Sequence, residues 1–346
     1  MNKNPSRSRV LPYPLWRLLS ACLLLTAFAP AAPAAHADEA AAAPRQLTTV
    51  ASLDRAARPA NVPLDYVVTP NGYFSPACVQ VIHQNETLRT DGSILQKNGA
   101  VRSAAKCDRP HFDRAGHSIA ATANGPVQAQ SASGTVEPTY TGWIESANYN
   151  NGSNVGRLRA TWKVPSVPGD AQNQTVFFFP GLEQLPTVQS ILQPVLGWNG
   201  FGDHTWTIAS WNCCTAGTTT HTDPVNVAPG DEIVGDTYSL CGVGVYNCGS
   251  WAIVTQDTTS GRSVTLNTSP QGNLQWVFGG VLEVYGISNC NQLPPQAMTQ
   301  FYGVTVWDTN GNVLSPPWQA GRAGSSISPQ CNYNVATSPG NVYLYY

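Results

Sequence analysis

Two polar residues stand inside apolar segments of the sequence, Gln193 in ILQPVLGW and Glu283 in VLEVYGI. Burying an amide costs free energy unless it is hydrogen-bonded, and burial raises the pKa of a carboxyl group. Alternate residues of a strand share a face. This alternation predicts that Ile191, Gln193 and Val195 share one face of their strand. It likewise predicts that Val281, Glu283, Tyr285 and Ile287 share one face of theirs. A glutamate that moves protons and a glutamine that donates a hydrogen bond are therefore candidates for catalysis.

Other chemistries have less support in the sequence. Nothing reads GxSxG, as the nucleophile of an α/β-hydrolase would, and neither CxxC nor HExxH is present. We therefore expect no metal and no cofactor. Two alternatives stay open. Glu183 and Glu283 have the residue type of a glycosidase carboxylate pair. Ten Trp and thirteen Tyr also suit a carbohydrate-binding sandwich without catalysis.

The segments that must position these residues read as strands from residue 139 onward. Short alternating or apolar stretches are separated by Gly, Pro and Asn: RLRATWKV, QTVFFFPG, HTWTIASW, DEIVGDTYSL, SWAIVTQD, RSVTLN, VFGGVLEVYGI and FYGVTVWD. No helical period is evident in this region. Many short strands with turn signals predict an all-β sandwich or barrel.

The N-terminal part predicts an exported precursor. Residues 1–37 combine a basic start, an apolar stretch too short to span a bilayer, and small residues before Asp38, as in a secretory signal peptide. Residues 38–115 contain a small folded unit, 116–137 a polar linker, and 138–346 the large β domain. This layout is typical of a secreted zymogen with a propeptide unit, although a plain two-domain secreted protein would look similar.

Cysteine and charge usage agree with an extracellular protein. Cys22 leaves with the signal, and the other eight cysteines are expected to form disulfides. We expect the pairs Cys78–Cys107, Cys241–Cys248 and Cys290–Cys331, while Cys213 and Cys214 pair with each other or elsewhere. Residues 138–346 hold five Lys or Arg against eleven Asp or Glu. Such acidic excess argues against nucleic-acid and anionic-membrane partners and suits an acidic environment.

An ordered series of segments resembles the glutamic peptidases, the eqolisin or G1 family. The series is LRATWKVP, FFFPGLEQ, ILQPVLGW, TWTIASW, VAPGDEI, TSGRSV and VLEVYGI. Glu183 stands where the family usually has Asp, and Ser210 stands about where it often has another Glu. The tryptophan that the family places beside its catalytic Glu is absent from VLEVYGI.

The resemblance implies a concanavalin-like antiparallel β-sandwich preceded by an N-terminal pro-segment. It implies a secreted acid endopeptidase acting on polypeptide substrates, with Gln193 and Glu283 at the catalytic positions. Glu183 would orient or tune the site, and Trp198 and Trp206 are candidates for a supporting or substrate-binding role, although core packing suits either tryptophan better. We expect a monomer that binds neither nucleic acid nor membrane.

Overall fold

The structure, a computed structural model, describes residues 58–103, 107–120, 140–185, 190–214, 217–270 and 272–346. All of them belong to one compact unit. The expected signal peptide lies outside the described residues, as do residues 38–57 of the expected propeptide unit and 121–137 of the expected linker.

The described residues contain no α-helix, which confirms the all-β prediction. Helical structure in them is limited to 3-10 turns such as η2 (Pro76–Cys78) and η4 (Cys290–Gln292). In this part of the chain, no helix is long and apolar enough to cross a membrane.

Three sheets form from the described strands. Sheet 1 is small and N-terminal, with the order β1 (Val67–Thr69), β2 (Gly72–Phe74), β7 (His111–Phe112) and β8 (Ser118–Ile119). Strand β8 lies inside the segment expected to be a linker, so the ordered N-terminal structure extends beyond residue 115.

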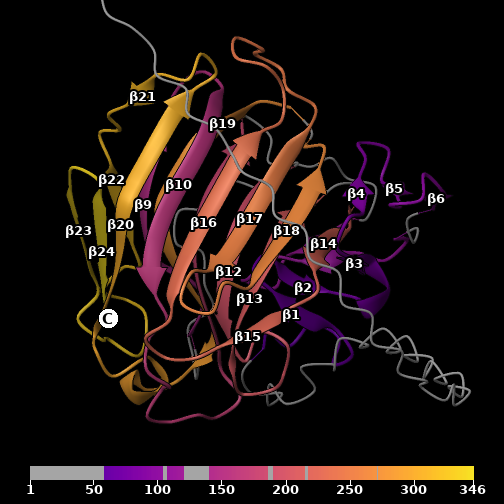
Figure 1. The fold of residues 1–346 in the computed structure, drawn as a ribbon. Coiled ribbons are helices and arrows are strands. Elements are labelled where there is room, and N and C mark those ends of the chain that lie inside the picture. Colours follow the sequence, from indigo (N-terminus) through magenta and orange to yellow (C-terminus); the bar gives the residue numbers. More distant parts are fainter. Residues whose placement is uncertain (1–57, 104–106, 121–139, 186–189, 215–216, 271) are drawn as a thin grey trace, which may run out of the picture. The chain divides into compact units, whose positions relative to one another are not determined.

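Sheet 2 is the larger of the two long sheets, and its central strands lie side by side in Figure 1. In spatial order it contains β23 (Asn334–Ser338), β24 (Asn341–Tyr345), β20 (Met298–Asp308), β10 (Val155–Lys163), β16 (Glu232–Ser239), β17 (Trp251–Asp257), β18 (Ser263–Thr268), β4 (Thr87–Leu88), β5 (Ile94–Leu95) and β6 (Val101–Arg102), with β21 (Val313–Leu314) beside β20.

Sheet 3 carries the two polar residues that stand in apolar segments. Its order is β22 (Gln319–Arg322), β9 (Tyr140–Asn150), β19 (Leu274–Ile287), β11 (Thr175–Gln184), β12 (Ile191–Trp198), β13 (Trp206–Cys213), β14 (Thr219–Thr222) and β3 (Val79–Ile82), with β15 (Val225–Val227) beside β13. Pairing within the β domain is antiparallel, as expected.

Sheets 2 and 3 pack face to face as a β-sandwich. The core between them joins residues such as Leu158 and Ile253 from sheet 2 to Phe178, Leu192 and Leu196 from sheet 3. A second buried cluster lies on the other face of sheet 3, where Phe177, Phe179 and Trp211 pack with Tyr73 and Phe74 of sheet 1. Sheet 3 is therefore apolar on both faces, as its nearly continuous apolar segments require.

The N-terminal residues also complete the edges of the sandwich. Strand β3 pairs in parallel with β14, and β4 pairs in parallel with β18. Ile82, Leu88 and Ile94 are buried in the core between sheets 2 and 3. In Figure 1 these strands, coloured indigo to purple, gather at one side of the sandwich. Edge strands offer unpaired backbone groups, and this segment covers one edge of each long sheet.

Four disulfides are present among the described residues. The pairs Cys78–Cys107, Cys241–Cys248 and Cys290–Cys331 confirm the prediction. Cys213 and Cys214 pair with each other, which resolves the alternative that the sequence left open. Each disulfide joins residues on the same side of the segment 121–139, so none ties sheet 1 to the β domain.

Gly235 is a position where the packing between the two long sheets admits no side chain. A Cβ there would lie 2.6 Å from Cγ of Pro194, which projects from β12 into the core. Overpacking a core costs about 1–3 kcal/mol. We therefore expect Gly235→Ala to lower the free energy of unfolding in urea by this amount. Gly249→Ala, where a Cβ meets nothing within 4 Å, should change it by less than about 0.5 kcal/mol. Equal effects of the two substitutions would contradict the packing described here.

Candidate active site on one face of sheet 3

Gln193 lies on the face of sheet 3 that is turned away from sheet 2. Its neighbours at alternate positions, Ile191 and Val195, belong to the cluster on that face, and Leu192 and Leu196 point into the core between the sheets. The alternation predicted for this strand is thus confirmed. We call this surface of β9, β19, β11, β12, β13 and β14 the site face.

The amide of Gln193 is buried without a partner. The residue has no exposed surface, and neither Nε2 nor Oε1 has a hydrogen-bond partner among the described residues. An unpartnered buried polar group typically costs about 1–3 kcal/mol, and a native exception of this kind points to a functional role. Gly181, across from Gln193 on β11, leaves space beside it, since a Cβ there would lie 3.7 Å from Cγ of Gln193.

Glu283 also lies on the site face and has no exposed surface. Its carboxylate is bound by three side chains from separate parts of the chain. Trp143 Nε1 donates to Oε2 at 2.8 Å, and the Tyr285 hydroxyl donates to Oε1 at 2.6 Å. Arg114, which follows β7 in the N-terminal part, donates through Nε to Oε1 and through Nη2 to Oε2, the latter at 3.2 Å.

Burial and pairing act in opposite directions on Glu283. Burial raises the pKa of this carboxyl above its ordinary value, and the charge and hydrogen bonds of Arg114, with those of Tyr285 and Trp143, oppose the rise. Burial alone would lower the pKa of Arg114, but the adjacent Glu283 raises it. The guanidinium also lies over the Trp143 ring, 4.9 Å from its centroid. Arg114 is therefore a buried cation held by one carboxylate and one aromatic face.

Gln193 and Glu283 are not cross-strand neighbours. Glu283 pairs with Phe177 of β11, and Phe177 pairs with Gly197 of β12, four residues from Gln193. On a flat sheet this offset would separate the two backbones by about 16 Å, from about 3.3 Å per residue and 4.8 Å per strand.

One turn of sheet 1, however, contacts strands of the site face that lie far apart in the sheet. Gly72 N donates to the Tyr285 hydroxyl at 2.9 Å, and the adjacent Asn71 Nδ2 donates to Thr219 Oγ1 at 3.5 Å. Two consecutive residues thus reach side chains from strands four positions apart in the sheet. Gln193 and Glu283 both lie on this face, and apolar residues beside them, such as Val195 and Val281, are buried in one cluster with residues of sheet 1.

Glu183 is the carboxyl nearest to Gln193 in the register of the sheet. It is opposite Ile191 of β12, two positions from Gln193, and opposite Trp276 of β19. Burial raises its pKa to about 8, and the charge of Arg114 opposes this rise. Glu183 is therefore a second carboxyl within the candidate site.

The two tryptophans considered for the site lie elsewhere. Trp198 and Trp206 pack against each other in the core between sheets 2 and 3, with ring centroids 5.6 Å apart. They are therefore on the opposite side of sheet 3 from Gln193 and Glu283. Ile287 also joins that core, because the strand is irregular beyond Val284 and Gly286 adopts a positive φ of 73°. The prediction that Ile287 shares the face of Glu283 is wrong for this reason.

Sequence reasoning missed the three side chains that hold Glu283. The strand alternation predicts the correct face for Tyr285 but does not indicate that it binds Glu283. Trp143 and Arg114 lie 140 and 169 residues from Glu283 in the sequence. A signal existed for Arg114, because a buried carboxylate needs a cation and the β domain contains few. Among the described residues, no group of three or more His, Cys, Asp or Glu side chains could hold a metal ion.

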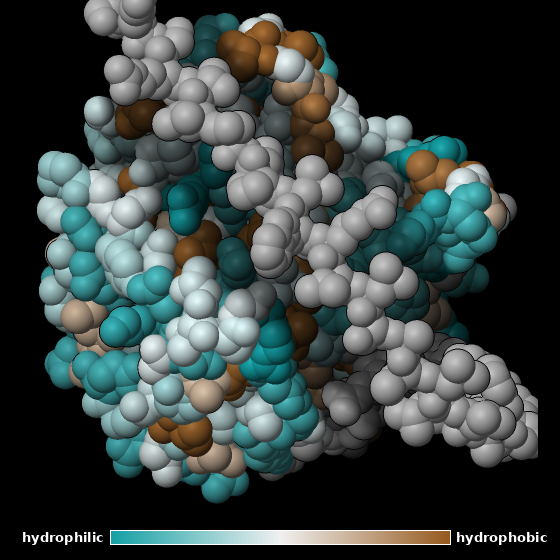
Figure 2. All heavy atoms as spheres, in the orientation of Figure 1, coloured by the Kyte–Doolittle hydropathy of each residue, from teal (hydrophilic) through white to brown (hydrophobic). Residues whose placement is uncertain are grey.

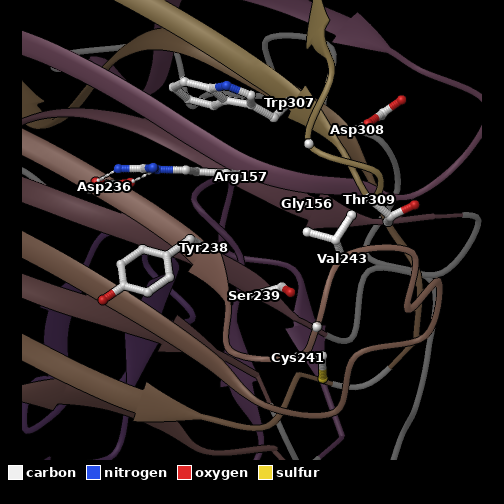
Figure 3. A pocket seen from close by; sticks show the side chains of 12 residues that line it. Gly156, Arg157, Asp236, Tyr238, Ser239, Cys241, Val243, Trp307, Asp308 and Thr309 are labelled. Carbon is white, nitrogen blue, oxygen red and sulfur yellow. Dashed lines mark hydrogen bonds and ion pairs between the residues drawn. The ribbon is translucent and has the colours of Figure 1, made fainter. Parts of the chain in front are cut away.

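A separate pocket of about 500 Å³ lies on the outer face of sheet 2 (Figure 3). Arg157 lies between Trp307 and Tyr238, with its guanidinium carbon 4.9 and 5.6 Å from the two ring centroids. It also donates through Nε to Asp236 Oδ1 at 2.7 Å. The guanidinium thus contacts the aromatic rings that a bound sugar would need.

The loop after β16 borders this pocket and is hydrophobic at its surface (Figures 1 and 2). Its exposed apolar residues are Leu240, Val243, Val245 and Tyr246. The loop is closed by the disulfide Cys241–Cys248. It borders the pocket through Cys241, Gly242 and Val243.

Comparisons with known proteins return structural likenesses at low identity. A scytalido-glutamic peptidase with a transition-state analog inhibitor aligns at 18% identity and a TM-score of 0.43, covering 61% of this chain and 100% of that chain. SCP-B, an eqolisin-family peptidase in complex with the tripeptide Ala-Ile-His, aligns at 20% identity and 0.42, with the same coverage. The aspergilloglutamic peptidase from Aspergillus niger aligns at 14% identity and 0.32, covering 50% of this chain and 98% of that chain.

Comparisons of sequence give no counterpart to these structural likenesses. No protein-family model matches the chain, and no curated protein matches it.

Two buried carboxyls should make the fold less stable as pH rises. Burial raises the pKa of Glu183 to about 8 and that of Glu145, in β9, to about 9. A raised folded-state pKa contributes stability below the unfolded value near 4.5, and this is lost as pH rises through the folded value. Burial lowers the pKa of His111 and His221 to about 4, so they act in the opposite direction, but only below about pH 6.5.

We therefore expect the free energy of unfolding in urea to fall between pH 6.5 and 8, by up to about 1.4 kcal/mol per pH unit for each carboxyl. Glu145→Gln should reduce this slope by about half. Asp91→Asn, at an exposed position of the N-terminal part, should leave the slope unchanged. A free energy of unfolding that rises with pH across this window would contradict the burial of the two carboxyls.

Proposed function

We propose that the chain is a secreted acid endopeptidase of the glutamic type, acting on polypeptides through Glu283 and Gln193. The observation that carries the proposal is the site face itself. It holds a fully buried carboxylate and a fully buried amide with no partner among the described residues, and apolar neighbours of both are buried in one cluster with sheet 1. The ordered segments that resemble glutamic peptidases support the same two residues, and the four disulfides are compatible with export.

The proposed reaction uses Glu283 first as base and then as acid. Its carboxylate takes a proton from water while the water oxygen bonds to the carbonyl carbon of the substrate. Gln193 Nε2 donates a hydrogen bond to the oxyanion that forms. Glu283 then gives its proton to the leaving nitrogen as the C–N bond breaks. General acid–base help contributes about 10²–10⁴-fold, and one oxyanion donor about 10²–10³-fold.

An amide suits the oxyanion role in an acidic site. Its NH2 group donates at any pH and adds no charge next to Glu283, whereas a second carboxylate there would repel the first. The side chains of Trp143 and Tyr285 would keep the Glu283 carboxylate in place during the reaction, because each donates to one of its oxygens. Glu183, two register positions from Gln193, would orient or tune the amide, and no cofactor is required.

The alternatives have weaker support in the geometry. A glycosidase needs two carboxyl groups about 5–9.5 Å apart. Glu283 pairs with Phe177 and Glu183 pairs with Trp276, so six residues of β11, about 20 Å of strand, separate the two acids. For the carbohydrate-binding alternative, the aromatic residues of the site face are buried against sheet 1, and those at the pocket of sheet 2 pack on Arg157.

The proposal predicts protein cleavage at acidic pH that depends on the site face. A digest of a protein substrate across pH 2–7 should show cleavage by the wild type. Glu283→Gln should lower the rate by about 10²-fold or more, and Gln193→Leu by about 10²–10³-fold. Glu232→Gln, on sheet 2, is the matched control and should match the wild type.

Comparison with Glu183→Gln assigns the base. A moderate loss in Glu183→Gln beside a near-complete loss in Glu283→Gln supports the proposed roles, and the reverse order would move the base to Glu183. A folded Glu283→Gln chain with full activity would end the assignment of Glu283. Mass spectrometry of the same samples would show whether the chain cuts itself within 116–137.

A further inference from the structure

Sheet 1 covers the face of sheet 3 on which a substrate would have to bind. We call residues 58–78 and 107–120 the plug; they include sheet 1 and the disulfide Cys78–Cys107. Plug residues such as Tyr73, Phe74 and Phe112 are buried in one cluster with Phe177 and Val281 of the site face. The plug therefore covers the site face with an apolar contact and excludes solvent from Glu283 and Gln193, which have no exposed surface.

The turn between β1 and β2 contacts two of the side chains that bind Glu283. Gly72 N donates to the Tyr285 hydroxyl, which in turn donates to Glu283. Arg114 Nη2 donates both to Pro70 O of the same turn, at 3.0 Å, and to Glu283 Oε2. Arg114 thus links the turn to the carboxylate by hydrogen bonds to both.

We infer that the plug is an intramolecular inhibitor, in which Arg114 binds the carboxylate of Glu283 and the β1–β2 turn occupies the place of the substrate. This inference rests on the proposed function, because only a working site can be inhibited. While Arg114 is bound, each oxygen of Glu283 accepts two hydrogen bonds, one from Arg114 and one from Tyr285 or Trp143, so neither oxygen has a lone pair left to take a proton from water. Without Arg114, each oxygen accepts only one of these bonds. The proposed catalytic residues are therefore in place on the site face, but the plug keeps a substrate from reaching them.

The chemistry of the contact explains why a cation is used. A buried carboxylate and a buried guanidinium are stable together, and each is strongly unfavourable when its partner is removed. Arg114 is nine-tenths buried or more, with an exposed fraction of 4%. The charge of Arg114 also opposes the rise that burial causes in the pKa of Glu183.

The plug is held near the site by the chain and not by a disulfide to the β domain. Its only described disulfide joins its own two parts, and residues 79–102 between them form the edge strands β3 to β6. A tethered group acts at a high effective concentration, so the plug inhibits without needing high affinity. A cut within 121–139 would leave it attached through the edge strands, free to be displaced by substrate.

Two substitutions in the plug test this inference without changing the site face. Arg114→Met keeps the apolar stem but removes the charge. Gly72→Ala disturbs the turn independently, because a Cβ there would lie 2.2 Å from Phe112 O, at a φ of +106°. Arg109→Met, at an exposed position of the plug, is the matched control. Initial rates on a quenched fluorescent peptide are measured near pH 4, with the intact chain verified by mass spectrometry at each time point.

We expect intact Arg114→Met and Gly72→Ala chains to cleave the peptide at least tenfold faster than the intact wild type. Arg109→Met should equal the wild type. A wild-type chain cut at a protease site inserted between residues 121 and 139 should gain activity as well. Adding Glu283→Gln to Arg114→Met should abolish the gain.

Two different failures can be told apart. Suppose that the cut chain or either variant cleaves the peptide, but that the intact Arg114→Met and Gly72→Ala chains both match the rate of the intact wild type within twofold. The inhibitor inference is then overturned, and the proposed function stands. If no form of the protein shows Glu283-dependent cleavage at any pH from 2 to 7, the proposed function fails, and the inhibitor inference fails with it.

Discussion

The burial of the Glu283 carboxylate is the constraint on which the rest of the site depends. A carboxylate with no exposed surface requires donors for its oxygens, and here they come from β9, from β19 and from the N-terminal part of the chain. The same requirement fixes where the plug sits, because Arg114 is the donor that supplies positive charge. Charge neutralisation thus ties the N-terminal segment to the face of the sandwich that carries the unusual amide.

A sheet that is apolar on both faces makes this arrangement possible. The outward face of sheet 3 would expose Phe177, Phe179 and Trp211 if sheet 1 were absent. Residues 79–102, which lie between the two parts of the plug, supply edge strands to both long sheets. One N-terminal segment therefore completes the edges of the sandwich and covers the face of sheet 3 that carries Glu283, and in our proposal the covering part is the inhibitor.

Much of the fold could be predicted from local pattern, and much of the site could not. The alternation in ILQPVLGW correctly predicted that Gln193 lies on the opposite face of the strand from Leu192 and Leu196, because successive side chains of any strand point to opposite faces. It failed at Ile287, where Gly286 changes the backbone, and at the linker boundary, where the two-residue strand β8 forms a hairpin with β7. The donors of Glu283 come from Trp143 and Arg114, far away in sequence, and no spacing rule connects them. The placement of Trp198 and Trp206 likewise depends on which sheet covers which face.

The most direct measurement is a crystal structure of the Arg114→Met chain with a bound peptide that carries a non-cleavable tetrahedral analogue of the scissile bond. Our account predicts that the peptide lies on the site face in place of the β1–β2 turn. One oxygen of the analogue should be within hydrogen-bond distance of Gln193 Nε2, and the other should be within that distance of the Glu283 carboxylate. A peptide bound at the Arg157 pocket, or a turn still seated on Tyr285 with the peptide elsewhere, would contradict it.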